Sequence, residues 1–255
     1  MRCFKCGSFL TDGDTCPQCG EYVGIYKKTA RVSDAYYNAG LYKARVRDLT
    51  GAVESLKISL MINKYNTNAR NLLGLVYCEM GDVVEALSQW VVSKNFTPEG
   101  NIAGHYIKKI QTNQNRFEMI TGTIRKYNLS LKYAKEGNLD MAVIQLKKVV
   151  ANNPQLIKAH LLLALIYIKQ DELSRAKKLL NAVLAIDKNN TLAHIYQKEI
   201  AERNAAKKAE TSGSFLPFPW AGPARYNGCL WYYLKRLLFL SVFQGRHIKN
   251  QVMEQ

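Results

Sequence analysis

A short segment that occurs four times constrains the fold of this chain more than any other feature. The four copies, hereafter the strings, are residues 47–52, 81–86, 137–142 and 171–176. Each string ends in an alanine, and the intervals from Ala52 to Ala86 and from Ala142 to Ala176 are both 34 residues. A large side chain follows four residues after each alanine, as Leu56, Trp90, Leu146 and Leu180. A period of this length is typical of stacked helical hairpins, in which every unit buries its apolar face against its neighbours.

The composition favours helices as well. Only six prolines occur in 255 residues, and apolar residues make up 47%, which is ordinary for a soluble folded protein. Small residues fit where two antiparallel helices cross closely, and Gly or Asn ends the first helix of a pair. We therefore expect an all-α fold.

The strings resemble the tetratricopeptide repeat (TPR) family. The small residue at the eighth position of each family unit is matched by Gly40, Gly74, Ser130 and Ala164. The aromatic residue three positions later is present as Tyr77, Tyr133 and Tyr167. The first unit departs with Lys43, and the proline that ends a unit occurs only as Pro98 and Pro154. The resemblance implies a right-handed α-solenoid with units at residues 33–66, 67–100, 123–156 and 157–190.

Two further segments complete a helical domain over residues 25–210. Residues 101–122 do not fit a full unit, but their apolar side chains have roughly helical spacing, so we expect one irregular helix within the stack. Residues 191–208 carry apolar side chains on one side and charges on the other. This last helix is expected to cap the solenoid.

The resemblance also implies a ligand groove. In the family, the first helices of successive units line a concave surface that suits an extended peptide or a partner helix. The paired Lys and Asn residues with which the family clamps a peptide carboxylate are not evident here. The residues that match groove positions, several of which could equally pack between helices, are Tyr37, Leu41, Asn71, Leu75, Tyr127, Leu131 and Leu161.

Four cysteines near the N-terminus form the second strong pattern. Cys3 and Cys6 make one C-x2-C pair, Cys16 and Cys19 make another, and a glycine follows each pair. Two cysteines three residues apart in a tight turn can direct both sulfurs to one metal ion, and four of them complete a tetrahedral site. Glycine lets such a turn donate backbone N–H groups toward the thiolates.

The cysteine pattern predicts one structural zinc ion. Four sulfur ligands leave no position open for water or substrate, which argues against catalysis at this site. A module of about 20 residues cannot bury enough apolar surface to fold alone, so the metal would supply most of its folding free energy. Iron with the same ligands, a redox dithiol and disulfides are the alternatives. Residues 3–20 resemble the zinc-ribbon family, and we expect a zinc ribbon at residues 1–24, as in bacterial proteins that join such a ribbon to TPR units.

The net charge of +16 raises the question of anionic partners such as nucleic acid, anionic lipid or acidic peptides. Basic residues are in excess along the whole chain, so the charge does not choose among these partners. Because no apolar export segment precedes the cysteines, we expect a protein of the reducing cytoplasm, with the cytoplasmic face of a membrane as the other location.

The C-terminal residues 211–255 differ in composition from the rest of the chain. A stretch rich in proline and glycine reads as a linker, and residues 229–243 form the most apolar segment. A spanning helix needs about 20 residues, whereas this segment has 15 and carries Lys235 and Arg236 near its centre. Peripheral membrane contact, docking against the solenoid or a partner, and a poorly ordered tail all remain open.

No catalytic arrangement is recognisable. The four histidines are scattered without metal-ligand spacing, and the glycines occur singly at expected helix ends. The sequence therefore predicts a non-enzymatic scaffold that binds a protein or peptide segment in the TPR groove. A nucleic-acid-binding adaptor that uses the ribbon and the basic surface is the first alternative, and a membrane-surface assembly factor held by residues 229–243 is the second.

Overall fold

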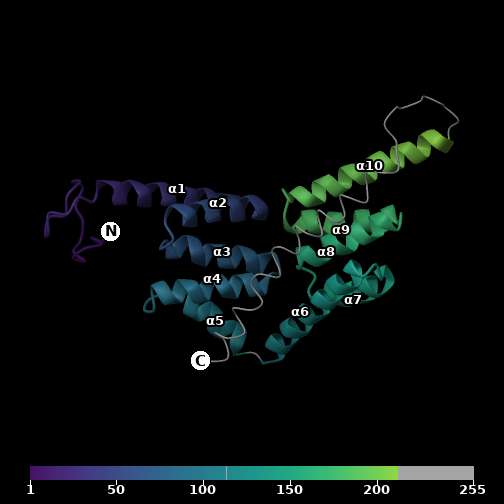
Figure 1. The fold of residues 1–255 in the computed structure, drawn as a ribbon, viewed down its shortest axis with the longest axis horizontal. Helices are drawn as coiled ribbons and strands as arrows, with labels where there is room; N and C mark the ends of the chain where they lie inside the picture. The colour runs from purple at the N-terminus through teal and green to yellow at the C-terminus, as the bar shows by residue number, and fades with distance from the viewer. Residues whose placement is uncertain (113, 212–255) are drawn as a thin grey trace. The chain divides into compact units, whose positions relative to one another are not determined.

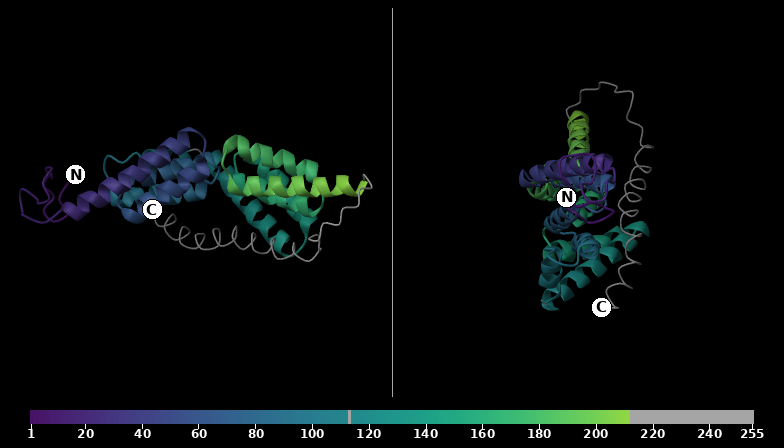
Figure 2. Two further views of the ribbon diagram at one scale, coloured as in Figure 1. Left: turned by 90° about the horizontal axis from the view of Figure 1, so that it is seen from above. Right: turned by 90° about the vertical axis from the view of Figure 1, so that its left-hand side faces the viewer.

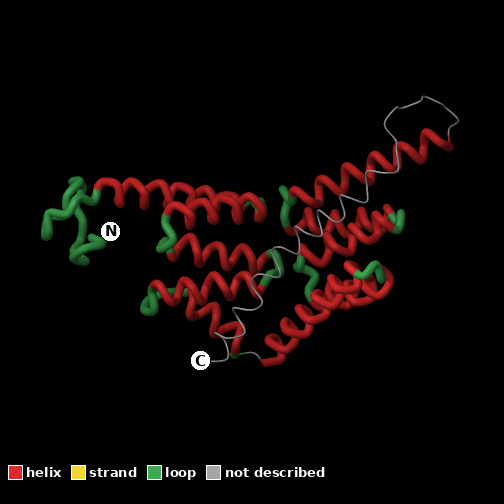
Figure 3. Tube along the Cα trace, in the orientation of Figure 1, coloured by secondary structure: helices red, strands yellow, loops and turns green. Residues whose placement is uncertain are grey.

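A computed structural model describes residues 1–112 and 114–211 (Figure 3). Within these residues the regular structure is helical, which confirms the predicted all-α fold. Residues 229–243, for which membrane contact was one expectation, lie outside the described part of the chain. Residues 1–202 form one compact unit. No helix among the described residues combines the length and the apolar character needed to cross a membrane.

The described chain contains ten helices (Figure 1). They are α1 (Gly24–Arg45), α2 (Leu49–Ile62), α3 (Thr67–Glu79), α4 (Val83–Phe96), α5 (Ala103–Gln111), α6 (Gln114–Lys135), α7 (Leu139–Asn152), α8 (Ile157–Lys169), α9 (Leu173–Ile186) and α10 (Thr191–Thr211). The most extensive packing joins four hairpins, α1 with α2, α3 with α4, α6 with α7, and α8 with α9. These hairpins correspond to the four strings of the sequence.

The turn inside each hairpin uses the same backbone geometry. Arg47, Gly81, Gly137 and Asp171 adopt φ angles of 63°, 76°, 80° and 63°. Within each pair of hairpins these residues are 34 positions apart, at 47 and 81 and at 137 and 171. A left-handed residue ends a helix and turns the chain back, which glycine does at the least steric cost. In the first and third hairpins the second helix then begins at a capping side chain. Asp48 accepts a hydrogen bond of 2.9 Å from Gly51 N, and Asn138 accepts one of 3.3 Å from Met141 N.

Small residues lie where the two helices of each hairpin cross. The alanines of the four strings are all 0% exposed. In the first hairpin, a methyl group at Gly40 would come within 2.7 Å of the Leu56 side chain. In the second, Gly74 of α3 lies against the ring of Trp90 on α4, and Trp90 Nε1 donates a hydrogen bond of 3.1 Å to the carbonyl oxygen of Asn71. The period of the sequence thus reflects close helix crossings.

Replacing Gly74 by alanine is expected to destabilise the protein by about 1–3 kcal/mol, because the new methyl group would overlap the Trp90 ring. The matched control is Gly104→Ala on α5, where a methyl group meets no neighbour within 4 Å. That change should be neutral or should stabilise the helix by up to about 1 kcal/mol. Urea unfolding of both variants measures the difference, and equal stabilities would contradict the close crossing.

Residues 101–122 form two helical parts rather than the one irregular helix expected. Helix α5 ends at Gln111, and α6 begins at Gln114, nine residues before the predicted start of the third unit at 123. Ala103 and Ile110 of α5 are buried, whereas Phe117 and Met119 at the start of α6 are 42% and 49% exposed. The apolar spacing read as one helix face therefore belongs to two helices with different surroundings.

The hairpins on either side of α5 meet through their loops as well. Asp187, which follows α9, is 0% exposed and reaches the N-terminus of α2. One carboxylate oxygen accepts bonds of 2.9 Å from Leu49 N and 3.2 Å from Thr50 N, and the other accepts one of 2.6 Å from Thr50 Oγ1. A carboxylate at this position satisfies the free N–H groups of a helix start and favours the positive end of its dipole.

A second contact joins the equivalent turn and loop one unit away, through different hydrogen bonds. Asn153, which is 34 residues before Asp187, donates a hydrogen bond of 3.2 Å to the carbonyl oxygen of Gly81. Gly81 packs so closely that a methyl group there would lie 2.6 Å from Leu156 N. Lys158 and Asp82 form an ion pair across the same contact. The turns of the first two hairpins are thus held against the loops that follow α7 and α9.

Helix α10 is buried along one face, and its Gln197 donates a hydrogen bond of 2.9 Å to Asn181 of α9. Ala193, Tyr196 and Ile200 are 0%, 1% and 3% exposed, whereas His194, Lys198 and Glu202 are exposed. This is the one-sided pattern expected for a helix that covers the end of a stack.

Candidate functional site

The first 23 residues, hereafter the cysteine module, consist of two similar loops. Cys3 N donates a hydrogen bond to Ser8 O, and Gly7 N donates one to Cys3 O. The second loop repeats both bonds, from Cys16 N to Glu21 O and from Gly20 N to Cys16 O. Gly7 and Gly20 have φ angles of 74° and 67°, a conformation that explains the glycine after each cysteine pair.

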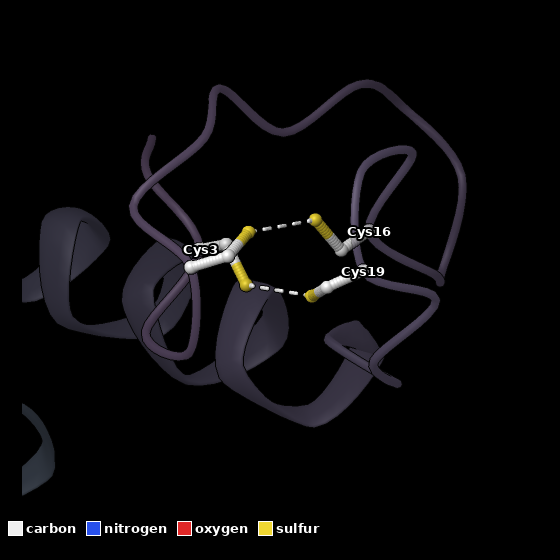
Figure 4. A group of neighbouring side chains, drawn as sticks. Cys3, Cys16 and Cys19 are labelled. Carbon is white, nitrogen blue, oxygen red and sulfur yellow. Dashed lines mark hydrogen bonds between the residues drawn. The ribbon is translucent and has the colours of Figure 1, made fainter.

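The two loops bring the four predicted ligands together. Figure 4 shows the sulfurs of Cys3, Cys16 and Cys19 directed toward a common centre. Cys3 Sγ lies 3.8 Å from Cys19 Sγ, and Cys6 Sγ lies 3.6 Å from Cys16 Sγ. All four sulfurs lie within 4.8 Å of one another. The cluster could therefore hold one metal ion.

The sulfur spacing fits a tetrahedral ion. Zinc–sulfur bonds of about 2.3 Å place the sulfurs of a regular tetrahedron about 3.8 Å apart. The two separations of 3.6 and 3.8 Å are close to this value. A disulfide needs sulfurs about 2.0 Å apart, so the four thiols are not arranged as two such bonds. The donor set is the one that zinc and iron sites of this kind use.

Ser8 is a part of this site that the sequence did not single out. Its hydroxyl oxygen lies 3.1 Å from Cys6 Sγ and 3.2 Å from Cys16 Sγ. Contact with the Ser8 hydroxyl is the main reason that the pKa of the Cys6 thiol is lowered and that the pKa of Cys16 falls to about 6. Cys16 therefore offers a thiolate, the form that binds metal, at neutral pH. The second loop has Glu21 at the position of Ser8, so the repeated spacing could not reveal this contact.

The environment of Cys19 disfavours a fourth thiolate in the cluster when no cation is present. The backbone N–H of Glu21 favours its thiolate, but burial and the three neighbouring thiols prevail and raise the pKa of Cys19 to about 12. Packing one more negative charge among sulfurs is unfavourable when nothing balances it. A divalent cation at the centre would remove this conflict, which is a further sign that the donor set suits a metal.

The cysteine module is attached to α1 by burial and by one lysine. Val23 is 0% exposed and packs with Cys3 and Cys16, and Leu10 lies against the same small core. Lys27 on the first turn of α1 is 8% exposed, and its ammonium group donates to backbone carbonyl oxygens of the loop between the cysteine pairs. The first turns of α1 thereby fix the module at the end of the helix (Figure 2).

The cysteine module exposes more large apolar side chains than its small core contains. Phe4 is 61% exposed and contacts Tyr26 edge to face, with ring centroids 5.6 Å apart. Phe9 is 70% exposed, and the Arg2 guanidinium lies 4.5 Å from its ring centroid. Tyr22 is 55% exposed. Exposed aromatic residues with arginine are the composition that protein interfaces favour.

The seven predicted groove residues fall into two groups. Asn71, Tyr127, Leu131 and Leu161 are buried, and Tyr37, Leu41 and Leu75 are partly exposed. Every side chain from Leu161 to Ile168 of α8 is buried, because this helix is apolar on all sides and other elements surround it. A buried side chain is not available to a partner, so contacts in a groove would fall on the three residues of α1 and α3 that remain partly exposed.

Comparison with known proteins supports the assignment of the last two repeats. Residues 133–198 match the family model described as tetratricopeptide repeat. This stretch runs from the end of α6 through α7, α8 and α9 into α10. No curated protein matches the chain.

Several solved structures match the chain with low sequence identity and low TM-scores. YrrB, a TPR protein with an unusual peptide-binding site, is 17% identical with a TM-score of 0.32, and the match covers 69% of this chain and 96% of YrrB. MamA from Desulfovibrio magneticus is 18% identical with a TM-score of 0.29, and the match covers 63% and 97% of the two chains. PilF of Pseudomonas aeruginosa is 13% identical with a TM-score of 0.29, covering 74% and 80%. Residues 133–198 are thus the part of the chain that matches the tetratricopeptide repeat family.

Proposed function

We propose that this protein is a non-enzymatic scaffold that binds a segment of another protein on its helical hairpins and carries a structural zinc ion in its cysteine module. The observation that carries the first part is the TPR match of residues 133–198, within hairpins that repeat the same crossing geometry. TPR proteins are in general scaffolds for protein–protein interaction. Helical-repeat stacks offer extended surfaces of this kind.

The groove contacts proposed for this function lie on the first helices of the first two hairpins. Tyr37 and Leu41 are partly exposed on α1, and Leu75 is partly exposed on α3. Tyr37 and Leu75 also pack against the core clusters of their hairpins, so replacing either would alter stability as well as binding. Leu41 is the better position for a binding test.

The experiment compares partner capture by the full chain with capture by the Leu41→Arg variant. Captured proteins are identified by mass spectrometry at low and at moderate salt. We expect Leu41→Arg to lose partners that resist salt, while Ile144→Arg retains them, because Ile144 is 46% exposed on α7, the second helix of its hairpin. Equal sets of partners for both variants would argue against the groove, provided that both variants unfold at the same temperature.

The zinc proposal rests on the sulfur geometry and on the thiolate character of Cys16. Cys3, Cys6, Cys16 and Cys19 would hold the ion, which would link the two loops without taking part in a reaction. Elemental analysis of the purified protein should give one zinc per chain. Iron bound by the same ligands would colour the protein and would replace zinc in this proposal.

Nucleic-acid binding is a second candidate function that the exposed aromatic residues of the module favour. Bases stack on exposed aromatic rings, and arginine next to a ring adds attraction to phosphate and base, as Arg2 and Phe9 could provide. Binding of this type falls steeply with salt. Capture of nucleic acid that is lost at moderate salt and by Phe9→Ser would favour this function over the scaffold.

A further inference from the structure

Helix α1 has a second apolar face that no described part of the chain covers. Its inner face packs on α2 and α3 through residues such as Ala30 and Gly40, which are buried. A second set of side chains, spaced alternately three and four residues apart, is exposed along the whole helix and its C-cap. The set, hereafter the outer stripe, consists of Ile25, Lys28, Val32, Ala35, Ala39, Tyr42 and Val46.

The outer stripe has the spacing of a coiled-coil seam. Alternation of three and four residues keeps side chains on one line of a helix and lets them interdigitate with a second helix. Six of the seven residues are apolar, and Ile25 and Tyr42 are 70% and 69% exposed. Single exposed apolar residues need no explanation, but a line of them over a helix of 22 residues does.

We propose that the outer stripe is a dimer interface, on which α1 of a second copy of this chain packs antiparallel. In an antiparallel register Val32 faces Ala35 of the second copy, and Ile25 faces its Tyr42. The alanines then lie opposite Val32 and Lys28, which allows the two helices to approach closely in the middle of the contact. A two-fold axis makes the same patch complementary to itself.

The charges of α1 distinguish this register from the parallel one. In a parallel pair Lys28 would face Lys28 of the second copy inside the seam, which is repulsive. In the antiparallel pair Lys28 faces Ala39, and Arg31 at the border of the stripe faces Asn38. No like charges are then opposed along α1, although the chain carries a net charge of +16.

The size of the contact sets the expected strength. The antiparallel register overlaps residues 25–42, which is about 27 Å of helix. An interface of one helix pair is at the small end of specific protein contacts, so we expect a dissociation constant in the micromolar range. The general repulsion between two positively charged chains should make the dimer tighten as salt rises.

Sedimentation velocity of the full-length, metal-loaded protein over a range of concentrations tests the proposal. We expect a monomer–dimer equilibrium that Val32→Glu abolishes. The matched control is Ile144→Glu on α7, where the apolar side chain is 46% exposed compared with 47% for Val32. A wild-type protein that stays monomeric at about 100 µM, well above micromolar dissociation constants, would overturn the proposal, as would a dimer that Val32→Glu leaves intact.

A pair of substitutions at Ala39 tests the register itself. Ala39→Glu would place a carboxylate opposite Lys28 of the second copy and should retain the dimer at low salt, whereas Ala39→Lys should abolish it. Equal effects of the two changes would overturn the antiparallel register. Circular dichroism of each variant confirms that the helices remain folded, since position 39 is exposed in the single chain.

Discussion

Removal of the metal is expected to unfold the cysteine module while helices α2–α10 stay folded. The module has a core of only a few residues around Val23, which is too small to hold its loops in place. Structural zinc sites contribute roughly 10–16 kcal/mol of apparent binding free energy at neutral pH, and this energy is also folding energy. Proteolysis between Thr11 and Thr15 should accelerate after chelation, whereas the helical circular dichroism signal should change little.

Single cysteine substitutions test the same role of the metal, and a cysteine outside the cluster provides the control. Cys16→Ser should abolish stoichiometric zinc, and Cys78→Ser should leave it unchanged, because Cys78 lies on α3 and is not one of the four clustered cysteines. Acid should release the metal, since the thiolates must bind protons as pH falls. A loop that resists proteolysis equally with and without metal would contradict the expected role of the ion.

Replacement of Asp187 by alanine is expected to cost roughly 2–4 kcal/mol of unfolding free energy, because several buried donors lose their acceptor. The carboxylate accepts from Leu49 N, from Thr50 N and from the Thr50 hydroxyl, and Asn190 Nδ2 adds a bond of 3.1 Å. Alanine would also remove the cap that Asp187 provides to α2 from a distant part of the chain. Urea unfolding, followed by the helical signal, measures the loss.

The control for this experiment is Asp140→Ala. Asp140 is an exposed carboxylate that accepts one hydrogen bond of 3.2 Å from Gln170, so its loss should change stability by less than about 0.5 kcal/mol. If the contact at Asp187 joins the two groups of hairpins, the variant should also unfold less cooperatively, in two steps. Equal stabilities of the two variants would show that Asp187 is dispensable.

The hairpins were predictable because helix packing constrains which residues can occur at fixed spacings in the sequence. A small residue at each crossing and a large one four positions later recur with the length of the unit, and the structure buries both, as at Ala86 and Trp90. The grouping of the four cysteines was predictable for a similar reason. Two residues three apart in a tight turn point the same way, whatever the rest of the chain does.

Several features of the candidate sites were not accessible in this way. Ser8 lies against two sulfurs, although its counterpart in the second loop is Glu21. Family positions assigned Tyr127 and Leu161 to the groove, and both are buried. Whether a side chain at such a position faces a partner depends on which other elements surround its helix, and a repeat pattern contains no information on that.

The sequence alone determined the helical class, the four hairpins and the cysteine cluster, because each follows from interactions between residues close together in the chain. The break between α5 and α6, the capping of α2 by Asp187 and the exposure of the outer stripe on α1 became visible only in three dimensions. The capping of α2 depends on a contact between segments more than 100 residues apart, and the exposure of the outer stripe depends on which described helices pack against α1. Such relations arise from the packing of whole hairpins, which local spacing does not encode.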